Sequence, residues 1–213
     1  MTLTKDQMLD AVTAQRVSLA DHLDGLGPEA WDTASLCAGW RVRDVVAHLV
    51  SILEIPVGTF LWKSATSGGF NKFADKSAKH IGARSPTDLA SALRANASKR
   101  FAPPVVGPIA PLTDIFVHTR DIERPLGFAS TLDAAALATA LDYVCGGKAR
   151  GFVPAKRTNG LRFEATDMQW SVGSGPVVSG PAEAILMAAT GRRSAASDLS
   201  GAGLGQFTDR LAG

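Results

Sequence analysis

The chain has 213 residues, 46% of them hydrophobic, so it can bury a core without disulfides or metal ions to hold it together. Its formal net charge is only +2 and no basic run is interleaved with aromatic residues, so we expect no nucleic-acid partner. The apolar stretches are far shorter than the roughly 20 residues of a membrane span and "MTLTKDQMLDAV" lacks the features of a secretion signal. We therefore expect a cytoplasmic protein with no membrane partner.

Helical periodicity dominates residues 1–150. Apolar residues predict a helix from Leu9 to Leu26, which "GLGP" ends, and a second helix in "WRVRDVVAHLVSILEI" with one broad apolar face. "TSGGFNKF" and "GARSPTD" are predicted breaks, and Pro86 suits the first turn of a third helix. Further helices are expected over about 112–124, opened by Pro111, and in "DAAALATALDYVCG".

The pattern changes near Gly151. "LRFEATDMQWSVGSGPVVSG" alternates apolar and polar residues between glycines, which predicts two or three short strands. "PAEAILMAATGRR" predicts a helix opened by Pro181 and closed by Gly191, followed by a loop-rich tail. The expected fold class is mainly α: a bundle of four or five helices over residues 1–150, then a small α+β domain over 151–213.

The segment "DIFVHTRDI" combines charged side chains with isoleucines on one helix face. Asp114, His118 and Asp121 fall within about 60° of one another on a helical wheel, with Ile115 and Ile122 on the same stripe. Residues four apart lie about 5–6 Å apart at Cβ, so one carboxylate and one imidazole can bind a single cation. Alternatively, the two aspartates are solvated and the apolar face is Leu112, Phe116 and Val117.

A second histidine favours the metal interpretation. His48 lies at the edge of the apolar arc of its predicted helix, between Ile52 and Ile55 on the wheel. A lone histidine there is more often a core or boundary residue than a ligand. With His118 and Asp114, however, it supplies two nitrogens and one oxygen, and three protein ligands leave one position on zinc for water or substrate.

Two further carboxylates are candidates for supporting roles. Asp44 lies one turn before His48 and can orient the second nitrogen of its ring. It also lies in the first turn of a helix, where the dipole favours a carboxylate without any function. Asp121 can orient His118, serve as a fourth ligand, or be a surface charge.

Other polar and aromatic residues are expected to be structural. Trp31 and Trp40 should hold the turn that leads into the second helix. The two cysteines, Cys37 and Cys145, are too few for a disulfide framework or a cysteine-based zinc site, and Cys37 has no local base to activate it. His22, in "DHLDG", and His80, in a lysine-rich linker, have no evident partner in the sequence.

The segments "WDTASLCAGWRVRDVVAHL" and "DIFVHTRDIERPLG" resemble the N-terminal domain of the mycothiol-dependent maleylpyruvate isomerase family of actinobacteria, part of the DinB-like four-helix metalloproteins. "ATDMQWSVGSGPVVSGPAEAILMAATGR" is similar to the C-terminal region of that family. The resemblance implies a divalent metal, typically zinc, held by His48, Asp114 and His118. Asp114 departs from the glutamate of the isomerase and is shorter by one methylene.

The resemblance also implies a reaction. The metal activates mycothiol, a small thiol cosubstrate, for isomerisation or S-transfer on a small electrophilic substrate. Family members hold substrate carboxylates with basic side chains, for which Arg192 and Arg193 are candidates, although both also suit helix-end cations. The alternative is a non-catalytic metal-binding bundle that serves as a stress-linked or interaction module. A homodimer is one candidate assembly of the chain.

Overall fold

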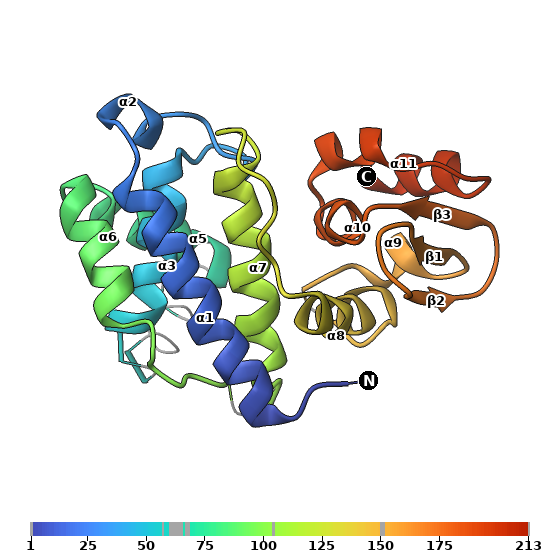
Figure 1. The fold of residues 1–213 in the computed structure, drawn as a ribbon, viewed down its shortest axis with the longest axis horizontal. Coiled ribbons are helices and arrows are strands. Elements are labelled where there is room, and N and C mark those ends of the chain that lie inside the picture. The colour runs from blue at the N-terminus through green and yellow to red at the C-terminus, as the bar shows by residue number, and fades with distance from the viewer. Residues whose placement is uncertain are drawn as a thin grey trace. The chain divides into compact units, whose positions relative to one another are not determined.

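The computed structural model describes residues 2–56, 58–59, 66, 69–103, 105–149 and 152–212. These residues form mainly helices, with a small sheet near the C-terminus, and so confirm the expected fold class (Figure 1). Among them, no helix combines the length and apolar character needed to cross a bilayer.

Contacts divide the chain into two compact units. One comprises residues 9–103 and 118–131, and the other comprises residues 1–8, 104–117 and 132–213. The division runs through the continuous helix α7 (Ile109–Glu123), between Val117 and His118. It does not coincide with the expected domain boundary near residue 150, which stays a prediction.

The first unit is built around α3 (Val42–Glu54), which packs against α5 (Phe70–Ile81) and α6 (Pro86–Ala95). Most of α3 is buried, including the polar residues Asp44, His48 and Ser51. This unit also contains α2 (Pro28–Trp31) and most of α1 (Lys5–Asp24), whose buried residues recur every three or four positions. Val17, one of the apolar residues from which this helix was predicted, is exposed rather than buried.

Helix α5 corrects one sequence expectation. The end of the predicted break "TSGGFNKF" and the supposed lysine-rich linker around His80 are helical, and His80 is exposed on this helix. Residues 67 and 68 of that break lie outside the described residues. Four residues of α5 are buried at helical spacing: Phe73, Ala74, Ala78 and Ile81. The sequence thus contains the apolar pattern of a helix, but the lysines between these residues obscured it.

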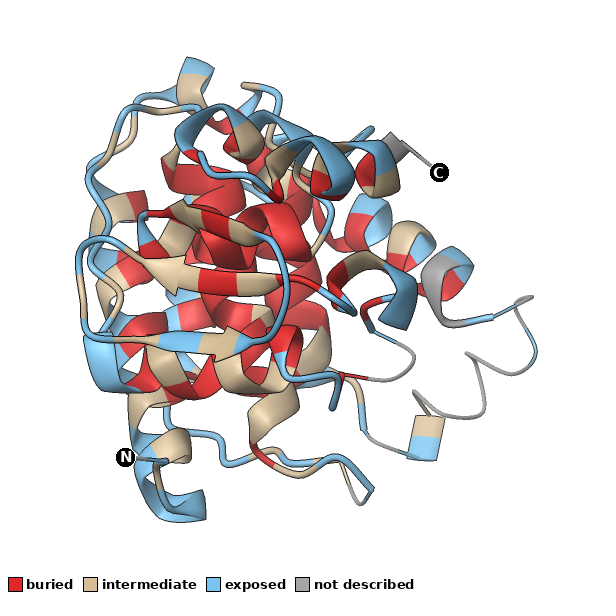
Figure 2. Ribbon diagram, turned by 90° about the vertical axis from the view of Figure 1, so that its right-hand side faces the viewer, coloured by how far each residue is buried: buried red, intermediate tan, exposed pale blue. Residues whose placement is uncertain are grey.

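The second unit contains the sheet, with strand order β2-β1-β3. Strand β1 (Arg162–Ala165) pairs antiparallel with β2 (Ser171–Gly173) and parallel with β3 (Val177–Gly180). Helix α10 (Ala182–Ala189) packs against β1, β3 and α8 (Ala134–Cys145). All its residues except Glu183 are buried. Figure 2 draws the buried residues of the chain in red.

The C-terminal tail is more ordered than the sequence indicated. After the short α9 (Ala155–Thr158) and the sheet, residues expected to form a loop-rich tail form the 3-10 helix η1 (Arg193–Asp198) and α11 (Leu204–Ala212). Helix α11 packs against α9, β3 and η1, and the ring of Phe207 meets Phe163 of β1 edge-on at 5.3 Å. The prediction of a loop was wrong because the burial of two residues, Phe207 and Leu211, stabilises this short helix.

Candidate metal centre

Helix α3 places His48 in the interior of its unit. Asp44 closes the first turn of this helix, because its Oδ2 accepts hydrogen bonds from the backbone N–H of Arg41 at 2.9 Å and from its Nε at 3.1 Å. These bonds fit the helix-end alternative for Asp44, and a role in orienting His48 stays a prediction. One turn later, His48 is 3% exposed.

Helix α7 supplies the other two candidates. Asp114 and His118 lie four residues apart, and both are half-buried. The neighbouring Ile115 and Ile122 are buried, and so are Leu112, Phe116 and Val117. The helix is therefore covered on most sides, and the alternative in which Asp121 is solvated is wrong, because this residue is 0% exposed.

The three candidate ligands converge. His48, Asp114 and His118 each offer one donor atom, and these atoms all lie within 4.8 Å of one another. The rings of His48 and His118 are 4.8 Å apart between centroids and nearly perpendicular, at 71°. Residues from two helices, separated by more than sixty positions in the sequence, thus face one point.

The donor set suits a divalent cation of the zinc type. Imidazole nitrogen and carboxylate oxygen bind zinc at about 2.0–2.2 Å, so two donors of a tetrahedral set lie about 3.3–3.6 Å apart. The donor atoms here lie up to 4.8 Å apart, so the side chains would move closer together to bind one ion. Two nitrogens and one oxygen match the count of protein ligands that catalytic zinc sites use.

Asp121 contacts one of the imidazoles. Its Oδ2 lies 2.9 Å from Nδ1 of His118, and its side chain is completely buried. A proton on Nδ1 shared with this carboxylate leaves the acceptor lone pair on Nε2, the arrangement in which imidazole binds a metal. The backbone carbonyl of Asp121 also accepts from Leu36 N–H at 3.1 Å, which ties α7 to the turn before α3.

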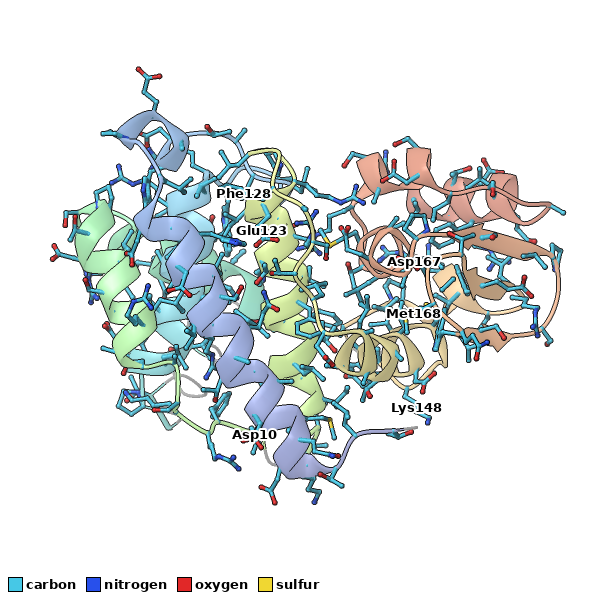
Figure 3. The ribbon with its side chains drawn as sticks, in the orientation of Figure 1. Asp10, Glu123, Phe128, Lys148, Asp167 and Met168 are labelled. Carbon is cyan, nitrogen blue, oxygen red and sulfur yellow. The ribbon has the colours of Figure 1, made fainter. Side chains whose placement is uncertain are left out.

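A second polar cluster, at the end of α7, was not predicted from the sequence. His22 Nδ1 lies 2.6 Å from Glu123 Oε1, and Arg120 donates to Glu123 Oε2 at 2.6 Å. The His22 ring stacks on Phe128, with centroids 4.9 Å apart, and Figure 3 shows Glu123 and Phe128 in this part of the chain. Because His22 and Glu123 are 101 positions apart, no local pattern predicts the pair.

The two arginines proposed from the sequence make backbone contacts. Arg192 donates to the carbonyl of Thr190 at 3.1 Å, and Arg193 donates to the carbonyl of Leu211 at 2.8 Å. These bonds fit the helix-end alternative, and a role in holding a substrate stays a prediction.

Of the two cysteines, Cys145 is buried and burial raises the pKa of its thiol, whereas Cys37 is half-buried. A thiol that stays protonated is a poor nucleophile, so Cys145 is structural.

Comparison with known proteins agrees with these observations. The family model described as Mycothiol maleylpyruvate isomerase N-terminal domain matches residues 12–103. Two solved structures resemble the chain: the mycothiol-dependent maleylpyruvate isomerase and a histidine-to-alanine mutant of it. Each shares 13% identity with it, with 95% of both chains covered and a TM-score of 0.66. Comparison with curated protein sequences gives no match.

These comparisons bear on two expectations. The family match confirms, for residues 12–103, the resemblance seen in the sequence. At 13% identity the structural likeness establishes the fold, and it confirms the DinB-like helical bundle followed by a small α+β part.

Proposed function

We propose that this protein is a metal-dependent enzyme acting with a small thiol. The proposal starts from the match of residues 12–103 to the mycothiol maleylpyruvate isomerase N-terminal domain. The observation that carries the proposal is the convergence of His48, Asp114 and His118 to within 4.8 Å. In this proposal they hold a zinc ion, mycothiol is the thiol, and the reaction is isomerisation or S-transfer on a small electrophile.

The chemistry follows from the number and type of donors. Three protein ligands leave one position on four-coordinate zinc for an exogenous molecule, whereas structural zinc sites are closed by four protein ligands. A thiol bound to such an ion is deprotonated and becomes a nucleophile at neutral pH. A cytoplasmic location belongs to the proposal, because the thiol must stay reduced to react.

The residues of the chain have distinct tasks in this scheme. His48 and His118 supply neutral imidazoles, and Asp121 keeps the His118 ring in the required tautomer through the contact at 2.9 Å. Asp114 supplies the only carboxylate among the three donors and offsets part of the charge of the ion. Because aspartate is shorter than glutamate, α7 must lie close to the ion for this carboxylate to reach it.

Metal analysis combined with a thiol titration tests the proposal. The wild-type protein should bind about one zinc per chain, and the loaded protein should bind mycothiol in calorimetry. His48→Ala should lose both, because it removes one of three donors. His80→Ala is the matched control, since His80 is exposed on α5 and should leave both unchanged.

Two results would contradict the proposal in different ways. If His48→Ala retained the zinc stoichiometry of the wild type, the assigned ligands would be wrong. If zinc bound as expected but neither the loaded nor the metal-free protein bound mycothiol, the protein would be a metal-binding module without thiol chemistry.

A further inference from the structure

Trp40 lies against both histidines of the candidate metal centre. Its ring centroid is 5.3 Å from that of His48, at an interplanar angle of 50°, and 6.4 Å from that of His118, at 25°. The side chain is half-buried, at the last residue before the N-cap of α3. From the sequence it was expected only to hold the turn, so its contact with the imidazoles is new information.

The turn fixes the backbone of Trp40. The carbonyl of Trp40 accepts hydrogen bonds from the backbone N–H of Ser35 at 2.9 Å and from its hydroxyl at 2.8 Å. Ala34 and Arg41 form an isolated antiparallel bridge across the same turn. The Cα of Trp40 is therefore held in place independently of its ring.

A separate helix fixes the ring. The indole Nε1–H donates to Asp75 Oδ1 on α5 at 2.9 Å, and Lys79, one turn later, donates to the same carboxylate at 2.9 Å. These two hydrogen bonds, that of Trp40 being the stronger influence, lower the pKa of Asp75 below that of an ordinary aspartate, which is itself ionised at neutral pH. An ionised acceptor makes the indole hydrogen bond a charge-assisted one.

We propose that Trp40 is a positioning residue for His48 and His118, and that Asp75, by holding the indole N–H, sets how tightly the centre binds its metal. The inference rests on the metal centre of the proposed function. An imidazole binds a metal only when its lone pair points at the ion, so a loss of ring orientation weakens binding. Asp121 orients His118 through a hydrogen bond, and the indole face limits rotation of both rings.

The ion pair of Asp75 and Lys79 would be unimportant without the indole. Their side chains are 44% and 58% exposed, and an exposed pair of this kind contributes little to stability. We therefore expect substitution of Asp75 to leave the fold intact and to act on the metal centre through Trp40.

The chain offers a matched control for this arrangement. Trp170, also half-buried, donates its Nε1–H to Asp142 Oδ1 at 2.9 Å. The geometry of this second pair matches that of Trp40 and Asp75, yet no described contact joins it to a histidine ring. Trp170→Phe and Asp142→Ala thus remove the same kind of hydrogen bond away from the imidazoles.

The test measures zinc affinity by competition with a chromophoric chelator, for the wild type and five variants. Trp40→Phe and Asp75→Ala should each weaken zinc binding by about tenfold to a hundredfold, the usual effect of losing a group that orients a ligand. Trp170→Phe and Asp142→Ala should bind zinc as the wild type does. Asp75→Asn should recover most of the affinity, because its amide oxygen can still accept the indole hydrogen bond.

Tryptophan emission checks separately that zinc binds beside Trp40. Zinc should change the emission of the wild type and of Trp170→Phe, and should leave that of Trp40→Phe unchanged. The chain has four tryptophans, so the difference between these variants isolates the response of Trp40.

The outcomes separate this inference from the proposed function. If the wild type binds zinc and Asp75→Ala, folded by circular dichroism, binds it equally well, the positioning role is wrong while the metal centre stands. The same conclusion follows if a folded Trp40→Phe retains wild-type affinity. If the wild type binds no zinc, the proposed function fails and this inference fails with it.

Discussion

At the scale of single residues, Asp114 is the only carboxylate among the three donors of the candidate centre. Asp114 is half-buried between buried neighbours on α7, so it is available as a donor at the point where His48 and His118 meet. Its removal should therefore affect metal binding more than folding.

Asp114→Ala should lower zinc affinity by more than the roughly tenfold to hundredfold that the loss of an orienting group costs, because a donor itself is lost. Helical content should be almost unchanged, since alanine has the highest helix propensity. Zinc competition and far-UV circular dichroism measure the two effects. A variant that unfolds yet keeps its zinc would show that Asp114 is architectural.

Substitutions in the cluster of His22, Arg120 and Glu123 should instead affect folding more than metal binding. Glu123→Ala leaves the buried guanidinium of Arg120 without its carboxylate, and breaking a buried pair in this way costs about 3–5 kcal/mol of unfolding free energy. Urea denaturation measures this cost. Asp10→Ala, at the residue labelled in Figure 3, is the control, since the pair of Asp10 with Arg100 is exposed and should contribute little. A Glu123→Ala variant as stable as Asp10→Ala would contradict the account.

At the scale of elements, the packing of α5 against α3 carries the positioning of Trp40. Gly82 ends α5, and a Cβ on it would lie 2.8 Å from the carbonyl oxygen of Ala78 and 2.9 Å from Asp44 Oδ1. Glycine is needed here because of this close approach to the first turn of α3, as its φ of −62° is accessible to any residue.

Gly82→Ala should consequently destabilise the protein by about 1–3 kcal/mol, the usual cost of overpacking. Gly27→Ala provides the comparison, because nothing lies within 4 Å of its Cβ position and its φ is −67°. Chemical denaturation of both variants decides the matter. Equal stability of the two would mean that α5 moves away from α3 at no cost.

Sequence and structure agree on elements with long apolar patterns. Helices α1, α3, α6, α7 and α8 and the strands lie close to where periodicity and turn residues predicted them. The prediction failed for α5 and α11, where lysines or glycines interrupt a short pattern and packing on distant residues such as Phe163 decides the structure.

At the scale of the whole molecule, the same distinction applies to the candidate centre. Asp114 and His118 are one turn apart, so local geometry was enough to pair them, and His48 joined them because it lies on an apolar face. The bond from Trp40 to Asp75 spans 35 positions and that from His22 to Glu123 spans 101, so neither leaves a periodic trace in the sequence. The proposed chemistry was therefore inferred from the resemblance to a family. The partners of Trp40 and His22 are known only from the folded structure.

The most direct test of the central claim is X-ray absorption at the zinc edge, with and without mycothiol. Without the thiol, zinc should be surrounded by nitrogen and oxygen alone at about 2.0–2.2 Å, because neither cysteine is among the ligands. With mycothiol, one sulfur should appear at about 2.3 Å. A spectrum that already contains sulfur without the thiol, or that does not change when the thiol is added, would contradict the account.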